Sequence, residues 1–266
     1  MKPTLSEVIE PIEEAAPRGW QEEWDNTGWQ VAPGDPEQMG CSGVLLSLDA
    51  TEAVVDEAVR EGLNLVVCHH PLLFRGVKRL VGATAVERIV ARALQHGIGI
   101  YAAHTNMDAA PGGVNFRLAE RLGLRQTRVL VPGAVPGVGL GCVGELAEEV
   151  PTEQFLDHLT RTLGLPCLRH SAIATDSVRR VAVCGGSGSE FIEAAGAAGA
   201  QLYLTADLKY HDFQRAEGRL TLVDGGHFET ERQILDVFYE LISKKIPNFA
   251  IHRAAVPSNA VGYRIG

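Results

Sequence analysis

The chain has 266 residues, of which 45% are hydrophobic and 21% are charged, as is typical of a globular protein with one or two domains. Its net charge of −9 argues against general binding to nucleic acid or to an anionic membrane, since both call for a basic surface. No apolar run approaches the ~20 residues of a membrane helix, and the first residues lack the apolar core of a secretory signal. The five cysteines are odd in number and form no CxxC pair, so we expect reduced thiols and a cytoplasmic location.

The first half of the sequence alternates between helical and extended patterns. Thr4 and Glu7 have the spacing of a capping box, and a helical pattern begins at Thr51 and ends near Gly62. We predict helices at 2–16, 51–62, 84–97 and 112–123, and strands at 43–50, 64–68 and 98–103. Because strand–helix–strand repeats form parallel sheets covered by helices, this half is predicted to have an α/β fold.

The Pro- and Gly-rich stretch 129–141 has no periodicity, and we interpret it as a boundary region. Beyond it, strands are predicted at 179–184, 201–207 and 220–226, and helices at 189–200 and 228–245. The sequence therefore predicts two linked three-layer α/β lobes of mostly parallel sheets with helices on both faces. The first lobe is predicted to comprise residues 1–128 plus 235–266, and the second residues 129–234.

Polar residues of the metal-ligand type follow three of these strands. His69 and His70 end the strand at 64–68, and "HTNMDAA" after the strand at 98–103 contains His104 and Asp108. A late strand runs into "DGGHFETE", which contains His227 and Glu231. Ligands of open α/β sheets collect at the carboxyl ends of the strands, so the topology predicts that these side chains converge.

The spacing of these residues favours a site for two metal ions. Neighbours in an extended strand point to opposite faces, so His69 and His70 are expected to bind different ions. His227 and Glu231 lie four residues apart at the start of a helix and can share one face of it. A carboxylate such as Asp108 or Glu231 can bridge two ions, as in two-metal hydrolases.

Each residue taken alone also has an ordinary structural explanation. A histidine at a strand end is more often a hydrogen-bonded structural residue, and Asp108 or Glu231 can stabilise the first turn of a helix. The metal interpretation depends on the coincidence of the three strand ends.

The motifs "HHPLLF", "HTNMDAAPGGVN", "TADLKYHD" and "DGGHFETE" together resemble the NIF-three-like family of dinuclear-metal proteins, known as GTP cyclohydrolase I type 2 homologues. The resemblance covers nearly the whole chain and implies two linked α/β lobes, commonly assembled as a toroidal homohexamer. It also implies two divalent ions per chain, held by five residues that correspond here to His69, His70, Asp108, His227 and Glu231. The segment between residues 124 and 178 is too short for the inserted domain that some members carry, which implies the short form of the family.

Two further histidines are candidates for catalysis by proton transfer. His104 lies four residues before Asp108, where a buried structural role, an extra metal ligand and a proton relay all remain open. His211 in "LKYHD" is either a second proton relay or a residue of a helix surface.

The stretch "CGGSGS" at 184–189 is open to three interpretations. It is a tight turn, a phosphate cradle at a helix N-terminus, or an incomplete nucleophile elbow around Ser187 that would make the protein a serine hydrolase. Cys68 is either a soft metal ligand, a redox-sensitive thiol or a small buried strand residue.

These features support two main hypotheses of function. The first is a metal-dependent hydrolase of a nucleotide or phosphoester, with an unknown small-molecule substrate. The second is a metal-binding, metal-chaperone or regulatory assembly without turnover. Imidazole and carboxylate ligands suit Zn, Mn, Fe, Ni or Co and do not choose among them.

Overall fold

The computed structural model describes residues 2–264 and divides into two units. Unit 1 comprises the residues up to Met107 together with Ile234–Ala260, and unit 2 comprises Asp108–Gln233 and the residues from Val261 onward. Among the described helices, none is both long and apolar enough to cross a bilayer.

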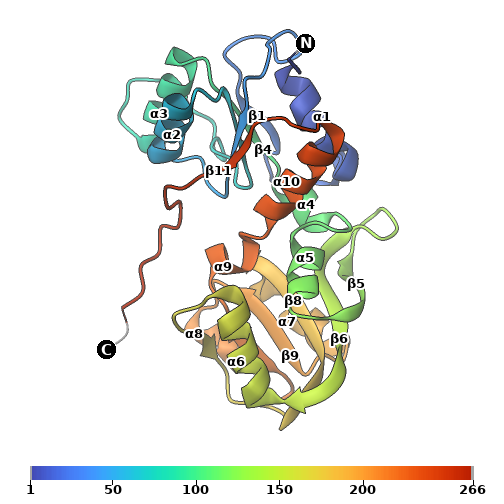
Figure 1. The fold of residues 1–266 in the computed structure, drawn as a ribbon. Coiled ribbons are helices and arrows are strands. Elements are labelled where there is room, and N and C mark those ends of the chain that lie inside the picture. Colours follow the sequence, from blue (N-terminus) through green and yellow to red (C-terminus); the bar gives the residue numbers. More distant parts are fainter. Residues whose placement is uncertain (1, 265–266) are drawn as a thin grey trace. The chain divides into compact units, whose positions relative to one another are not determined.

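Unit 1 is built on a five-stranded sheet in the order β1–β4–β3–β2–β11 (Figure 1). Four strands run parallel and β1 pairs antiparallel with β4. The strands are β1 (Gly28–Val31), β2 (Val44–Ser47), β3 (Leu65–Cys68), β4 (Gly99–Ala102) and β11 (Ile251–Arg253). Every residue of β2, β3 and β4 is buried, as expected for parallel strands covered on both faces.

The helices of unit 1 cover both faces of this sheet (Figure 1). Helices α2 and α3 pack together, and their apolar residues share one core with Leu45, Val66 and Ile100 of the strands. Helix α1 packs against α10. The capping box of α1, formed by Thr4 and Glu7, is present as expected. The elements are α1 (Leu5–Ala15), the 3-10 turn η1 (Arg18–Trp20), α2 (Glu52–Glu61), α3 (Ala85–Gln95) and α10 (Ile234–Lys245).

Unit 2 contains a six-stranded mixed sheet in the order β5–β6–β8–β9–β10–β7. Strands β8, β9 and β10 run parallel, and the other three pairings are antiparallel. The strands are β5 (Arg125–Pro132), β6 (Gly139–Pro151), β7 (Arg169–His170), β8 (Ser177–Ser187), β9 (Leu202–Ala206) and β10 (Thr221–Asp224).

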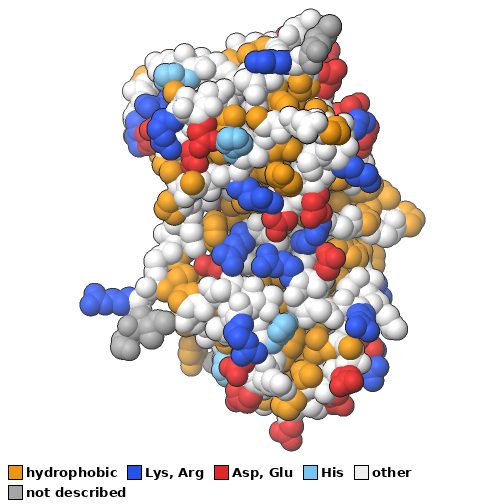
Figure 2. All heavy atoms as spheres, in the orientation of Figure 1, with side chains coloured by type: hydrophobic (Ala, Val, Ile, Leu, Met, Phe, Trp, Pro, Cys, Tyr) orange, Lys and Arg blue, Asp and Glu red, His pale blue; other side chains and the backbone are white. Residues whose placement is uncertain are grey.

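Helices also cover both faces of the second sheet. Leu118 of α5 and Phe155 of α6 belong to one core cluster with the strands, whereas Ile192 and Ala195 of α7 belong to another. The helical elements are α4 (Thr105–Ala109), which begins in unit 1, α5 (Val114–Arg121), α6 (Thr152–Leu163), η2 (Ser189–Phe191), α7 (Ile192–Ala197), α8 (Tyr210–Gln214) and α9 (His227–Glu231). On the face drawn in Figure 2, acidic and basic side chains are interspersed.

The two-lobed α/β fold with helices on both faces is confirmed, and the mostly parallel pairing holds for the first sheet. The expected domain boundary is not where the structure divides. Stretch 129–141 is a hairpin in which Val129 pairs with Cys142 and Pro132 with Gly139, rather than a linker. Helix α5 packs on β6 and β8, so the chain already enters unit 2 at Asp108. Pro and Gly there form the turn between two strands.

The prediction of one continuous helix at 228–245 is wrong, because the structure has two helices there, α9 and α10. The buried side chain of Gln233 donates from Nε2 to the carbonyl of Thr230. That carbonyl would accept from the amide of Ile234 in a continuous helix, so the side chain takes up the acceptor where the helix breaks. Helix α10 and β11 then belong to unit 1, as expected for the C-terminal segment.

A buried carboxylate fixes the chain that follows β11. Glu57 of α2 is only 1% exposed and accepts from the amides of Ala255 and Val256 at 2.7 and 3.0 Å. We expect Glu57→Gln to lower the free energy of unfolding of unit 1 by about 1–3 kcal/mol, because the new amide nitrogen would face a backbone N–H in place of a carboxylate oxygen. Glu52→Gln is the matched control on the same helix, since its ion pair with Arg88 is exposed. Denaturant unfolding measures both, and equal midpoints would contradict the prediction.

Candidate metal-binding groups

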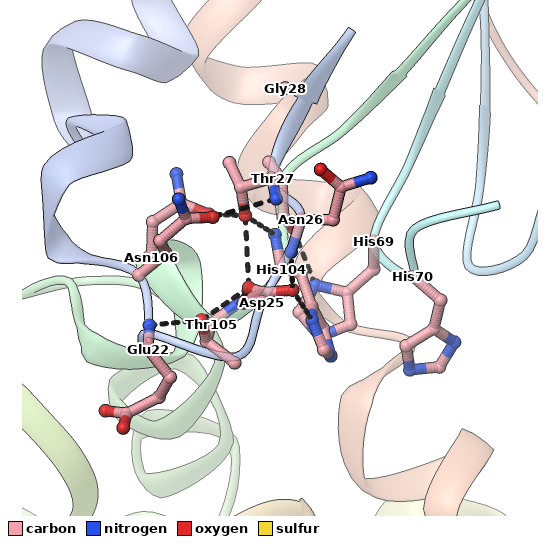
Figure 3. A network of polar contacts seen from close by, with 12 residues as sticks. Glu22, Asp25, Asn26, Thr27, Gly28, His69, His70, His104, Thr105 and Asn106 are labelled. Carbon is pink, nitrogen blue, oxygen red and sulfur yellow. Dashed lines mark hydrogen bonds and ion pairs between the residues drawn. The ribbon is translucent and has the colours of Figure 1, made fainter. Parts of the chain in front are cut away.

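Three imidazoles lie together at one edge of the first sheet (Figure 3). The rings of His69, His70 and His104 have centroids 5.0 to 5.6 Å apart, and one nitrogen of each lies within 4.8 Å of those of the others. His69 and His70 follow β3, and His104 follows β4. Because β3 and β4 are parallel with Cys68 opposite Ala102, both exits occur at the same carboxyl edge. We call these three residues the histidine group.

The expected alternation of His69 and His70 is wrong, because neither belongs to a strand. Both backbone amides donate to the carbonyl of Leu48, at 3.1 and 3.0 Å, so the chain turns there. The two rings consequently lie near each other instead of on opposite faces of a pleat. Assignment of the two histidines to different ions therefore stays a prediction without that geometric support.

Each ring of the histidine group is oriented by a hydrogen bond from Nδ1. His69 donates to the carbonyl of Ala103, and His70 to the carboxylate of Asp49, both at 2.8 Å. His104 donates to Asp25, also at 2.8 Å. These oxygens only accept hydrogen bonds, so Nδ1 carries the proton and a neutral ring presents the Nε2 lone pair. Metal-ligating histidines have this arrangement, in which the second nitrogen is held by a carboxylate or carbonyl.

Asp25 is the centre of a buried network behind His104 (Figure 3). Its side chain is fully buried and accepts from the amide of Thr105 at 3.0 Å and from the hydroxyls of Thr27 and Thr105. Burial alone would raise the pKa of Asp25, but hydrogen bonds from His104 and Thr105 outweigh it and hold the pKa well below its usual range. Asp25 is therefore a carboxylate that fixes the position and tautomer of His104.

Carboxylates dominate the candidate residues of unit 2, Asp108, His227 and Glu231, which we call the carboxylate group. His227 and Glu231 lie on α9, with Nε2 of the histidine 3.1 Å from Oε2 of the glutamate. An oxygen of Asp108 lies within 4.8 Å of one of Glu231. Both Glu231 and the adjoining Thr230 are buried. The spacing of four residues thus brings His227 and Glu231 together, as predicted.

The carboxylate group favours a cation. His227 donates from Nδ1 to Asp207 at 2.7 Å. Burial would lower the pKa of His227, but its hydrogen bonds to Asp207 and Glu231 raise it to about 10. A bound metal ion would take the place of the Nε2 proton, because a ligating imidazole is neutral. Nitrogen and oxygen donors without a thiolate fit Zn, Mn, Fe, Ni or Co.

The glycines of "CGGSGS" make room for Glu231. Strand β8 continues through Ser187, so residues 184–187 are the end of a strand and not a tight turn. A Cβ placed on Gly186 would lie 2.0 Å from Oε1 of Glu231, and φ there is +63°. The amide of Gly186 donates to the hydroxyl of Thr230, and the amide of Gly185 to the side chain of Asn115. Asn115 in turn donates to the carbonyl of Asp108 and so links β8 to that residue.

His211, unlike His104, belongs to neither group among the described residues. It is an exposed residue of α8, with its ring against Tyr210 and Nδ1 3.3 Å from Oε1 of Gln214. Cys68 is fully buried in β3, and burial together with Asp49 raises the pKa of its thiol well above the usual range. It therefore fits the small buried strand residue rather than a thiolate ligand.

The sequence did not reveal which carboxylates orient the histidines, although Asp207 was expected to line a pocket. Asp25, Asp49 and Asp207 each accept from Nδ1 of a histidine. Asp49 and Asp207 follow β2 and β9, so the rule that selected the histidines at strand ends would have found them. Asp207 has φ of +57°, an uncommon conformation for a residue other than glycine. Asp25 lies in a loop before β1, where no such signal exists.

Residues 3–259 match the Duf34/NIF3 (NGG1p interacting factor 3) family. The chain belongs to this family. A Clostridium perfringens protein named GTP cyclohydrolase 1 type 2 homolog is 33% identical over 246 residues, covering 91% of this chain and 92% of the relative. NIF3-like protein 1 of Drosophila melanogaster is 30% identical over 250 residues, covering 91% and 82%.

Two solved structures have a similar fold. A Bacillus cereus protein related to NIF3 has a TM-score of 0.89 at 26% identity, covering 99% of this chain and all of that one. Reduced HcgD from Methanocaldococcus jannaschii has a TM-score of 0.80 at 27% identity, covering 95% and 98%. These matches confirm the family predicted from the motifs.

We expect Gly186→Ala to weaken metal binding at least tenfold, on the order of the effect of disturbing residues around a metal site. The new methyl group would displace the carboxylate of Glu231. The matched control is Gly218→Ala in the same unit, where φ is +68° but nothing lies within 4 Å of the added Cβ. Equilibrium dialysis with Zn²⁺ or Mn²⁺ measures the affinity. Equal affinities in the two variants would show that the glycine matters only for backbone conformation.

Proposed function

We propose that this protein is a dinuclear metal-dependent hydrolase that acts on a nucleotide or a phosphoester-type small molecule. The five proposed ligands are His69, His70, Asp108, His227 and Glu231. The observation that carries the proposal is the hydrogen bonding of their histidines, each of which donates from Nδ1 to an oxygen. This arrangement leaves Nε2 of each ring as the ligand atom.

The composition of the two groups supports a centre of two ions. Three of the five proposed ligands are imidazoles and two are carboxylates. A set of three imidazoles and two carboxylates compensates part of the charge of two divalent ions and provides a carboxylate able to bridge them. The names of the curated relatives, GTP cyclohydrolase 1 type 2 homologs, suggest a nucleotide as substrate.

Two divalent ions, when bound, would lower the pKa of a water molecule and stabilise negative charge on the attacked group. The protein's own contribution is to place a proton carrier beside them. Asp25 fixes the proton of His104 on Nδ1, so Nε2 is the atom with which His104 would accept a proton from an attacking water. His104 is thus the first choice for the general base, and His211 remains a weaker candidate.

The second candidate function is a metal-binding or regulatory protein without turnover. One nitrogen of His104 lies within 4.8 Å of nitrogens of His69 and His70, which is close enough for all three to bind one ion. If His104 is a ligand, it is lost as a base, and a site closed by protein ligands is typical of a structural metal. The family description as an interacting factor is compatible with this alternative. A toroidal homohexamer remains part of both proposals.

Metal content is the direct measure of the five ligands. We expect the wild type to bind two ions per chain after reconstitution, and His69→Ala and Glu231→Ala each to bind fewer. His96→Ala is the control in unit 1, because this exposed histidine caps α3 and belongs to no donor group. Elemental analysis after gel filtration gives the stoichiometry. Unchanged content in both ligand variants would contradict the proposed centre.

Turnover decides between the two functions. We expect metal-loaded wild type to hydrolyse at least one compound in a panel of nucleotides and phosphoesters, and Glu231→Ala to be inactive. Replacing His104 by Gln is expected to reduce the rate by about 10²-fold or more, while metal content stays at two, if the residue transfers protons. Equal near-zero rates in the wild type and Glu231→Ala would favour the non-catalytic alternative. Loss of metal from the His104 variant would identify a ligand.

A further inference from the structure

Two large aromatic side chains are exposed beside the histidine group of unit 1. Trp24 is 59% exposed and Phe74 is 50% exposed, and their ring centroids lie 5.8 Å apart. The ring of Trp24 also lies 6.0 Å from that of His104. A single exposed ring is ordinary, but two rings close to each other beside a candidate reaction centre suggest a surface for a ligand.

Hydrogen bonds join the two segments that carry these rings. The side chain of Asn26 donates to the carbonyl of Leu73 at 2.8 Å, and the amide of Leu73 donates to Gln30 at 2.9 Å. Gln30 is buried and donates back to the carbonyl of Asn26 at 2.7 Å. Trp24 and Phe74 therefore belong to segments that are joined to each other, so the backbone that carries the two rings is prearranged, which lowers the entropic cost of binding.

The chain that follows Phe74 is basic. Arg75, Lys78 and Arg79 are exposed, and no carboxylate within residues 2–264 lies at ion-pair distance from them. The nearby carboxylate of Glu87 accepts from the amides of Val81 and Ala83, both at 3.0 Å. Lys78 and Arg79 line a surface depression of ≈ 450 Å³. Unpaired cations in a concave surface favour an anionic ligand such as phosphate.

We propose that Trp24 and Phe74 stack against the planar ring of a nucleotide, and that Arg75, Lys78 and Arg79 bind its phosphates. Lys78 lies four positions after Phe74, so the two subsites are at most about 14 Å apart along the chain, within the length of a nucleoside triphosphate. This inference rests on the proposed function in one respect: it assigns a substrate class and a binding surface to the same hydrolytic site. His104, beside Trp24, would face the bound molecule.

A single nucleotide fits this surface better than a nucleic acid or a second copy of the chain. The net charge of −9 and the acidic Glu22 and Glu23 beside Trp24 oppose a long polyanion. In a two-fold interface that used this surface on both copies, the cations of one copy would face those of the other, which is costly. A short anion that carries its own ring satisfies the cations and the aromatic residues together.

The test is calorimetric titration of the chelator-treated protein with GTP, UTP, guanosine and inorganic triphosphate. We expect Trp24→Ala to weaken the binding of the nucleotides and of guanosine about 5- to 50-fold, as for base stacking elsewhere. The affinity for triphosphate is expected to stay unchanged. The double variant Lys78→Ala/Arg79→Ala should weaken the binding of the nucleotides and of triphosphate but not that of guanosine. Tyr210→Ala, which removes a 75% exposed aromatic side chain of unit 2, and Arg60→Ala/Arg161→Ala are the matched controls.

Tryptophan fluorescence locates the ligand independently. Trp24→Phe keeps a ring for stacking, so we expect it to bind GTP with nearly wild-type affinity and to lose the quenching that GTP causes in the wild type. Failure of both nucleotides to bind at millimolar concentration, or equal binding by the Trp24→Ala variant, would overturn the inference. So would loss of assembly in Trp24→Ala with nucleotide binding unchanged. Metal content is measured in a separate experiment. A failure to bind nucleotide therefore would not count against the proposed metal centre.

Discussion

Parallel pairing of β2, β3 and β4 in register is the constraint on which the histidine group depends. Ser47, Cys68 and Ala102 form one row across the sheet, so the chain leaves all three strands at the same edge. The residues that follow are then brought together without any local motif. Asp49 after β2 orients His70 after β3, and His104 follows β4. The same rows of buried apolar residues that stabilise unit 1 thereby align its polar edge.

Much of this arrangement could be predicted from the sequence, because strand ends in an α/β fold can be read from apolar runs. Thr51 and Gly62 did bound α2, and His69 and His70 do lie together with His104 at one edge of the sheet, whereas the set of five ligands stays a prediction. Hydrogen bonding across distant segments could not be predicted. Asp25 reaches His104 from a loop 79 residues earlier, and only the fold brings the two together.

The wrong predictions have a common physical cause: local composition does not reveal the groups with which a segment pairs or forms hydrogen bonds in the fold. The Pro–Gly stretch 129–141 has the composition of a linker, yet β6 pairs with β5 across it. The helical pattern at 228–245 is continuous in the sequence, yet the side chain of Gln233 donates to a backbone carbonyl that a continuous helix would pair with a backbone amide. His69 and His70 were judged by strand geometry, although both amides turn toward Leu48.

The insertion of unit 2 within unit 1 has a consequence for how the protein is made. Strand β2 pairs with β11 on one side, and β11 is synthesised some 200 residues after β2. Until the ribosome has released residues 251–253, the edge of β2, a strand of four fully buried residues, stays open in the nascent chain. An open apolar edge is prone to pair with other chains. The last strand to be synthesised therefore closes the first sheet, and the chain depends on protection of that edge while unit 2 is being translated.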